Sequence, residues 1–161
     1  MNIRRMLFVC TGNSCRSVMA EGLMRQVLQR AGLVGLEVAS AGMFAIEGMN
    51  ATRETVGVLQ GAGIDASNHR AHSVTAEAAE QADVIFVMER FHADELLRRY
   101  PHIAGKVHLL KPYGLPQGEL VGEPGIPDPI GKPLEVYEVC FTEIREAVER
   151  IARSFTDAKP K

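Results

Sequence analysis

Short apolar runs alternate with longer segments along this chain, and the two kinds of segment predict strands and helices. Continuous apolar runs of about five residues are typical of strands buried on both faces. We interpret four short segments as strands, at residues 5–9, 36–39, 83–88 and 106–110. Five further segments are interpreted as helices, at residues 17–31, 50–60, 75–81, 90–100 and 134–155.

The two longest of these helices show the clearest amphipathic pattern. Residues 17–31 have apolar side chains three or four positions apart, which places them on one face of a helix. The same spacing runs through the last predicted helix, at Leu134, Tyr137, Phe141, Ile144, Val148, Ile151 and Phe155. Helix ends are indicated by Thr75 as a candidate N-cap, Gly32 as a candidate stop and Pro101.

The order of these elements predicts the fold class. Strands that alternate with helices are typical of an α/β protein in three layers, with a twisted parallel sheet covered by helices on both faces. Ligands bind such sheets at the carboxyl ends of the strands. We therefore expect the functional site at Cys10 and just after it, where the first strand ends.

The length of 161 residues fits one domain. We assign residues 1–156 to this domain and expect a frayed C-terminal tail at residues 157–161. Residues 111–133 contain six of the eight prolines and five glycines, so they are predicted to be a long loop. Long loops in compact domains often carry functional residues.

Composition and charge exclude several classes of function. The chain has 20 acidic and 18 basic residues, a net charge of −2, so we expect neither nucleic acid nor a membrane surface as a partner. The apolar run before Thr11 is too short for a signal-peptide core, and three cysteines are too few for a disulfide framework. We predict a cytoplasmic protein. The five histidines do not cluster with cysteines or carboxylates, so no metal or other cofactor is expected.

The segment after the first strand has the composition of a phosphate-binding loop. It reads Cys10-Thr-Gly-Asn-Ser-Cys-Arg16-Ser17 and leads into a predicted helix. Gly12 and Asn13 tolerate positive φ, which lets successive amides from Thr11 onward, through Ser14 and Cys15, point inward around an anion. The planar guanidinium of Arg16 can hold two phosphate oxygens. Cys10 lies at the bottom of the same loop, where a thiolate is favoured and is aimed at phosphorus.

Two alternatives compete with this interpretation. A cysteine at the end of a strand can be an inert buried thiol, although the full eight-residue pattern between a strand and a helix disfavours that. The loop could also belong to a binding module without activity. The presence of Cys10 and Arg16 in one loop argues against such a module.

The chain resembles the low-molecular-weight protein tyrosine phosphatases over nearly its whole length. The resemblance rests on the loop above and on Ser40-Ala-Gly42, Asn68-His69, residues 83–88 and Asp128-Pro129. It implies a four-stranded parallel sheet and a reaction through a phosphocysteine, with Cys10 as nucleophile. It also implies that Asp128 is the general acid and then the base for water. On the residues alone, an Asp-Pro pair is more often a turn.

The resemblance further implies a network that supports the loop. Asn13, Ser17, Ser40 and His69 are its expected members, and Ser17 is expected to donate toward the nucleophile. Ser17 could instead, or in addition, be the N-cap of the following helix. Cys15 is a candidate for a reversible disulfide with Cys10, with a small packed side chain as the alternative.

The substrate is less sharply indicated. Phosphotyrosine is predicted, with phosphorylated proteins or peptides as partners and a monomer or weak dimer as the state of the chain. Ile130 and Gly131 follow Pro129 where the family has aromatic residues, and Phe44 could supply the missing wall unless it is tucked inward. The small polar Ser14 keeps open a protein-arginine phosphatase, a branch of the same family.

Thioredoxin-coupled arsenate reductases share this fold and this loop. Their mechanism needs further cysteines that resolve the nucleophile through disulfides. This chain has no cysteine between Arg16 and Val139, and Cys140 is predicted to lie in the core. An arsenate reductase is therefore disfavoured.

Overall fold

The computed structural model describes residues 2–157 and contains one parallel sheet of four strands. The strands are β1 (Arg5–Cys10), β2 (Glu37–Gly42), β3 (Val84–Val87) and β4 (Val107–Leu109). Their order in the sheet is β2-β1-β3-β4, so β1 lies between two partners. Val9 is opposite Ala41 on one side and Val87 on the other, and Cys10 is opposite Gly42. The predicted class of fold is confirmed.

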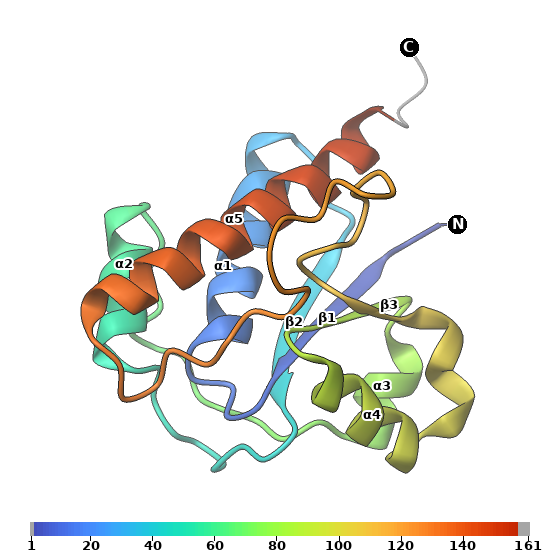
Figure 1. The fold of residues 1–161 in the computed structure, drawn as a ribbon, viewed down its shortest axis with the longest axis horizontal. Coiled ribbons are helices and arrows are strands. Elements are labelled where there is room, and N and C mark those ends of the chain that lie inside the picture. The colour runs from blue at the N-terminus through green and yellow to red at the C-terminus, as the bar shows by residue number, and fades with distance from the viewer. Residues whose placement is uncertain (1, 158–161) are drawn as a thin grey trace.

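Helices cover both faces of the sheet (Figure 1). One face is covered by α1 (Arg16–Arg30), α2 (Arg53–Gly61) and α5 (Leu134–Asp157). The other is covered by α3 (Ala76–Gln81) and α4 (Arg90–Arg99), which a 3-10 helix, η1 (Pro101–Lys106), follows. Successive side chains of β1 point to opposite faces of the sheet, so the core has two parts. Phe8 and Cys10 face α1, while Leu7 and Val9 face the opposite helical layer.

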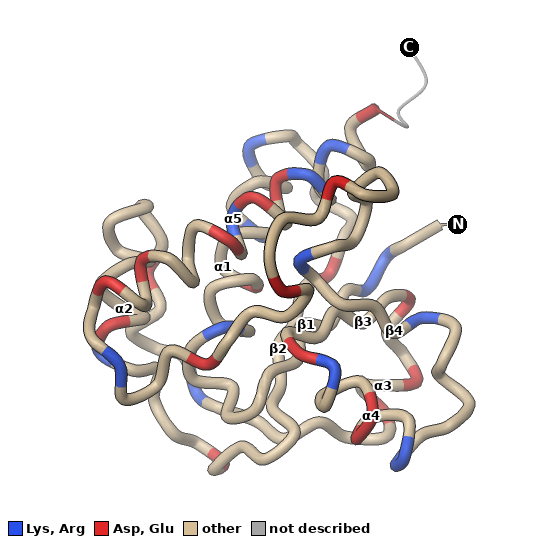
Figure 2. Tube along the Cα trace, viewed as in Figure 1, with Lys and Arg blue, Asp and Glu red and all other residues tan. Residues whose placement is uncertain are grey.

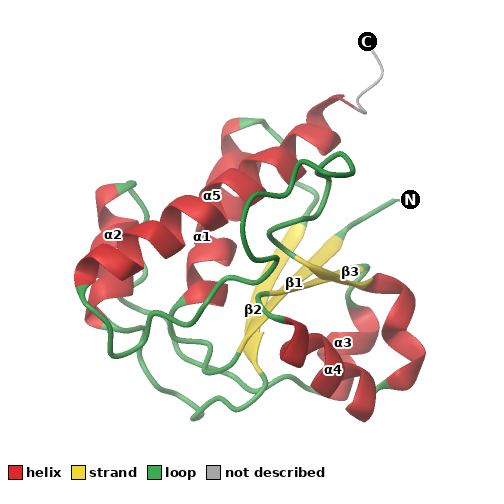
Figure 3. Ribbon diagram, in the orientation of Figure 1, coloured by secondary structure: helices red, strands yellow, loops and turns green. Residues whose placement is uncertain are grey.

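The long α5 follows its predicted pattern. Tyr137, Ile144, Val148 and Ile151 are buried, and the helix packs across α1. Acidic and basic residues both lie along the helix (Figure 2), as expected for an amphipathic helix with one face in solvent. The segment between β4 and α5 contains neither helix nor strand (Figure 3), so the predicted long loop is confirmed.

Several boundaries differ from the predicted ones. The second helix begins at Arg53 instead of residue 50, because the side chain of Thr52 accepts a hydrogen bond from the backbone of Thr55 and caps it. Thr75 caps α3 in the same way, as predicted. The strand β2 continues to Gly42, three residues beyond its predicted end. The last helix includes Asp157, so it enters the predicted tail, whose residues 158–161 lie outside the described part.

The proposed N-cap role of Ser17 is wrong. Cys15 precedes the first helical residue and has no capping side-chain bond, while Ser17 lies inside α1. Within residues 2–157, no helix has the length and apolarity needed to cross a membrane.

Candidate active site

The loop at the centre of the site joins the end of β1 to the start of α1. Cys10 is the last strand residue and Arg16 the first helical one. Within residues 2–157, the backbone N–H groups from Thr11 to Arg16 donate to no other protein group. A row of free amides before a helix N-terminus is suited to bind an anion.

The conformation of the loop depends on Asn13 more than on Gly12. Asn13 is buried and has a φ of 51°, in the left-handed region that asparagine tolerates. Gly12 does not have positive φ, so the expectation for this residue is wrong. Its added Cβ would meet only the Ser14 hydroxyl, at an ordinary 3.5 Å.

Gly42 is the glycine that the loop requires. A Cβ at this position would lie 2.6 Å from the carbonyl oxygen of Thr11 and 3.0 Å from the nitrogen of Asn13. These are backbone atoms of the loop and cannot move aside as a flexible side chain would. The end of β2 therefore lies directly against the loop because residue 42 has no side chain.

Both polar atoms of the Asn13 side-chain amide form hydrogen bonds. Its Nδ2 donates to the hydroxyls of Ser17 (2.8 Å) and Ser40 (2.9 Å), and its Oδ1 accepts from the backbone of His72 (3.0 Å). The ring of His69 donates from Nε2 to the Asn13 carbonyl at 2.7 Å. The four residues expected to support the loop are thus joined in one network, which fixes the left-handed turn.

The network also leaves the Ser17 hydroxyl able to donate to Cys10. The hydroxyl of Ser17 lies 3.0 Å from Cys10 Sγ. Because the Ser17 oxygen already accepts from Asn13, its hydrogen is free to point at the sulfur. Cys10 is buried at the bottom of the loop.

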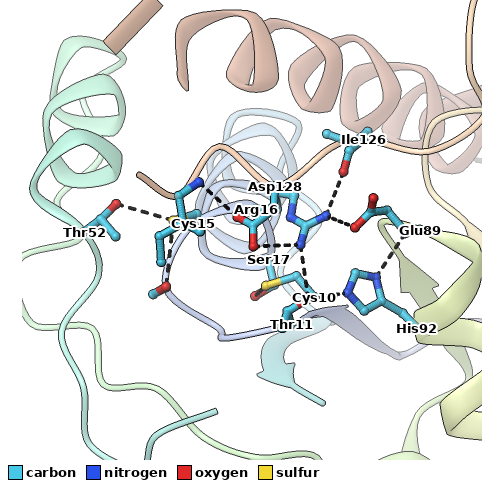
Figure 4. Close-up of polar contacts among 12 residues, drawn as sticks. Cys10, Thr11, Cys15, Arg16, Ser17, Thr52, Glu89, His92, Ile126 and Asp128 are labelled. Atoms are coloured by element: carbon cyan, nitrogen blue, oxygen red, sulfur yellow. Dashed lines mark hydrogen bonds and ion pairs between the residues drawn. The ribbon is translucent and has the colours of Figure 1, made fainter. Parts of the chain in front are cut away.

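Arg16 is buried although it carries a positive charge, with only 1% of its surface exposed. Its Nη1 donates to Glu89 and to the carbonyl of Ile126, each at 2.7 Å (Figure 4). Its Nη2 donates to the hydroxyl of Thr11 at 3.3 Å and lies 3.5 Å from Asp128. Its Nε has no hydrogen-bond partner within residues 2–157. The edge formed by Nε and Nη2 therefore remains available to an oxyanion.

The two carboxylate oxygens of Asp128 have different surroundings. One oxygen, Oδ1, accepts from the backbone of Ile130 at 3.1 Å, which makes a turn. The other, Oδ2, faces Arg16. The loop that carries Asp128 is anchored to the sheet, because Ile126 donates to the Met88 carbonyl and accepts from Arg16.

Cys15 is buried, and its side chain contacts residues of the α2 and α5 segments. Its sulfur contacts the hydroxyls of Thr52 (3.5 Å) and Tyr137 (3.8 Å), and all three cysteines are free. Burial raises the pKa of Tyr137 to about 12, so its phenol stays protonated. Cys140 lies in the core as predicted, where burial raises the pKa of its thiol to about 12.

Exposed apolar side chains lie on the segments next to the loop. Phe44 is 58% exposed, so the alternative that it is tucked inward is wrong. Its backbone donates to the Thr11 carbonyl, and the guanidinium of Arg99 lies 5.4 Å from the centre of its ring. Ile130 and Phe91 are also about half exposed, whereas Ser14 is buried in the loop.

Two residues of the site, Glu89 and His92, were not predicted from the sequence. They lie at the N-terminus of α4, where Glu89 pairs with Arg16 and the Nε2 atom of His92 lies 2.9 Å from the hydroxyl of Thr11. Their position directly after β3, at the carboxyl end of a central strand, is the signal that could have found them. The described residues hold no group of three His, Cys, Asp or Glu side chains placed to bind a metal.

Comparison with known proteins gives consistent matches over almost the whole chain. The family model described as Low molecular weight phosphotyrosine protein phosphatase matches residues 5–160. A protein-arginine-phosphatase of Geobacillus stearothermophilus is 38% identical over 149 residues, which cover 92% of this chain and 93% of that protein.

Two solved structures have the same fold. A low molecular weight protein tyrosine phosphatase from T. tengcongensis is 39% identical with a TM-score of 0.85, and the match covers 94% of this chain and 99% of that one. A mutant of the YwlE arginine phosphatase with a phosphorylated active-site serine is 31% identical with a TM-score of 0.86, covering 96% and 97%.

Proposed function

Because the chain belongs to the low-molecular-weight protein tyrosine phosphatase family of cysteine-dependent hydrolases, we propose that it hydrolyses phosphotyrosine in proteins through a phosphocysteine. One observation carries this proposal. The buried guanidinium of Arg16, with its free Nε, and the free amides from Thr11 onward surround one site beside Cys10. Buried donors of this kind are costly unless an anion takes them up.

In the first step, the Cys10 thiolate attacks phosphorus and the bond from phosphorus to the tyrosine oxygen breaks. Asp128 gives its proton to the departing oxygen, so the leaving group is a neutral phenol. The loop amides and Arg16 bind the three equatorial oxygens on which negative charge develops. The hydrogen bond from Ser17 stabilises the thiolate before attack.

In the second step, water attacks the phosphocysteine and Asp128 takes a proton from it. The bond from phosphorus to sulfur breaks, which releases inorganic phosphate and restores the Cys10 thiolate. The related YwlE mutant with a phosphorylated active-site serine supports transfer of the phosphoryl group to the residue at the nucleophile position.

Phosphoarginine is the second candidate substrate, with the same three catalytic residues. The similarity to a named protein-arginine-phosphatase supports it, and so does the small side chain of Ser14 in the loop. The ring of Phe44 serves either substrate, since it can stack on a phenyl ring or face a guanidinium, as it already faces that of Arg99. The half-exposed Ile130 would form the other wall.

The experiment that tests the proposal measures phosphate release from two peptides of matched sequence, one phosphotyrosyl and one phosphoarginyl. We expect turnover of the phosphotyrosyl peptide, and its complete loss in Cys10→Ser, which keeps the binding of vanadate. A clear preference for the phosphoarginyl peptide would transfer the assignment to the second candidate. Turnover that survives Cys10→Ser would contradict the cysteine mechanism for both.

Further predictions from the sequence belong to this proposal as well. The protein acts in the cytoplasm, as a monomer or weak dimer, on phosphorylated proteins or peptides. Asn13, Ser17, Ser40 and His69 hold the loop in its binding conformation, which their shared network supports. Cys15 forms a reversible disulfide with Cys10 under oxidation.

A further inference from the structure

His92 is a buried histidine beside the site that the mechanism above does not use. It is 0% exposed and occupies the first turn of α4. Its ring contacts the loop through the hydroxyl of Thr11, on the side away from Cys15 (Figure 4). A histidine placed this way either packs structurally or directs a hydrogen bond within the site.

The hydrogen bonds of the ring determine its tautomer. The backbone N–H of Glu89 donates to Nδ1 of His92 at 3.0 Å, so this nitrogen carries no proton. The proton of the neutral ring must then be on Nε2, which lies 2.9 Å from the Thr11 oxygen and donates to it. Burial, and then the positive charge of Arg16, lowers the pKa of His92 to about 3, so the ring is neutral near pH 7.

The hydroxyl of Thr11 therefore has both acceptor positions filled. It accepts one hydrogen bond from His92 and a second from Nη2 of Arg16 at 3.3 Å. A hydroxyl has two lone pairs and one hydrogen, so this hydrogen must point away from both donors. Within residues 2–157 the Thr11 hydroxyl has no further hydrogen-bond partner, and the residue is partly exposed and follows Cys10 directly, so its hydrogen is available to a ligand bound beside Cys10.

We propose that His92 is a positioning residue that orients the Thr11 hydroxyl, which then holds Nη2 of Arg16 and donates its own hydrogen to the bound phosphoryl group. This inference rests on the proposed function and adds a side-chain donor to the loop amides. Without the proton on Nε2, the hydroxyl could turn its hydrogen toward the ring and would be lost to the substrate.

A double-mutant cycle tests the proposal. Thr11→Val removes the hydroxyl and keeps the shape, while His92→Asn keeps an acceptor for the Glu89 backbone but is too short to reach Thr11. Each change is expected to lower kcat/KM for an aryl phosphate by roughly tenfold, the effect of one hydrogen bond to a charged group. The double variant is also expected to lose about tenfold, because His92 acts only through Thr11.

A multiplied loss of about a hundredfold in the double variant would overturn the proposal, and so would full activity of either single variant. His102→Asn is the matched control, since His102 is exposed on η1 and far in sequence from the loop. If His92→Asn does not fold, the activities of Thr11→Ser and Thr11→Val are compared instead, because only the serine variant keeps the hydroxyl. The serine variant should keep most of the activity, and equal activities of the two would contradict the proposal.

The same cycle is repeated as a binding measurement in the Cys10→Ser background, with inorganic phosphate as the probe and calorimetry as the readout. We expect about tenfold weaker binding in each single variant and in the double variant. Coupled phosphate binding without turnover in the native background would refute the proposed function and leave the role of His92 standing. Turnover by the native protein, with independent effects of the two substitutions on phosphate binding, would support the proposed function and overturn the role of His92.

Discussion

At the scale of the residue, single side chains in this site carry two tasks at once. Asp128 closes a turn with one oxygen and faces Arg16 with the other. Asn13 adopts positive φ and also connects Ser17 to Ser40. A structural bond therefore does not argue against the proposed functional role of such a residue, because a second atom of the same side chain stays directed into the site.

The division of labour in Asp128 leads to a prediction for Asp128→Asn. The variant keeps an oxygen for the Ile130 backbone but cannot donate a proton from a carboxyl group. We expect kcat/KM for a phosphotyrosyl peptide to fall by roughly a hundredfold or more. Hydrolysis of p-nitrophenyl phosphate, whose leaving group departs without a proton, should fall much less. Steady-state kinetics on both substrates measures the difference, and equal losses would mean that Asp128 only shapes the turn.

At the scale of the element, the loop is held from both neighbouring strands. The end of β2 supports it through Gly42, and the segment after β3 supports Arg16 through Glu89. From the other side, the N-cap residue of α2, Thr52, donates its backbone N–H to the Ser14 carbonyl at 3.1 Å. The site is thus the place where the ends of several elements converge.

This dependence predicts the effect of Gly42→Ala. The added methyl group would lie 2.6 Å from the Thr11 carbonyl, so the loop backbone must shift. We expect at least tenfold lower kcat/KM and a loss of about 1–3 kcal/mol in the free energy of unfolding, as for an overpacked core. Gly35→Ala is the control, because its methyl group would meet no atom within 4 Å. Kinetics and urea unfolding of the two variants should differ, and similar values would contradict the close approach.

At the scale of the whole molecule, the fold keeps charged and titratable groups buried next to the site. Arg16 and His92 are both enclosed, and the positive charge of the first disfavours protonation of the second. The stability of the protein should therefore depend on pH through His92. Its pKa is 6.5 when exposed and about 3 in the fold.

The sign of this dependence follows from proton binding. Below pH 6.5 the unfolded chain takes up a proton at His92 that the folded chain refuses until about pH 3, so acid favours unfolding. Between pH 6.5 and about pH 5 we expect His92 to cost up to about 2 kcal/mol of stability. Urea unfolding of the native protein and of His92→Asn at several pH values measures it. The native protein should lose more stability than the variant as the pH falls, and parallel curves would contradict the low pKa.

The sequence by itself determined the class of fold and the identity of the central loop. Both depend on local patterns, since apolar spacing follows from which face of an element is buried. The run from Cys10 to Arg16 is contiguous, so its chemistry could be predicted before its shape. Asp128 required the family resemblance, because an Asp-Pro pair alone indicates only a turn.

The tertiary structure decided what no local pattern contains. Glu89 and His92 contact the loop across more than 70 residues of sequence, and only the pairing of β1 with β3 brings them there. The same holds for Gly42, whose role depends on the backbone of another strand end. The exposure of Phe44 and the start of α2 were also settled by packing and capping. Contacts between strand ends depend on the order of strands in the sheet, which the spacing of residues along the chain does not encode.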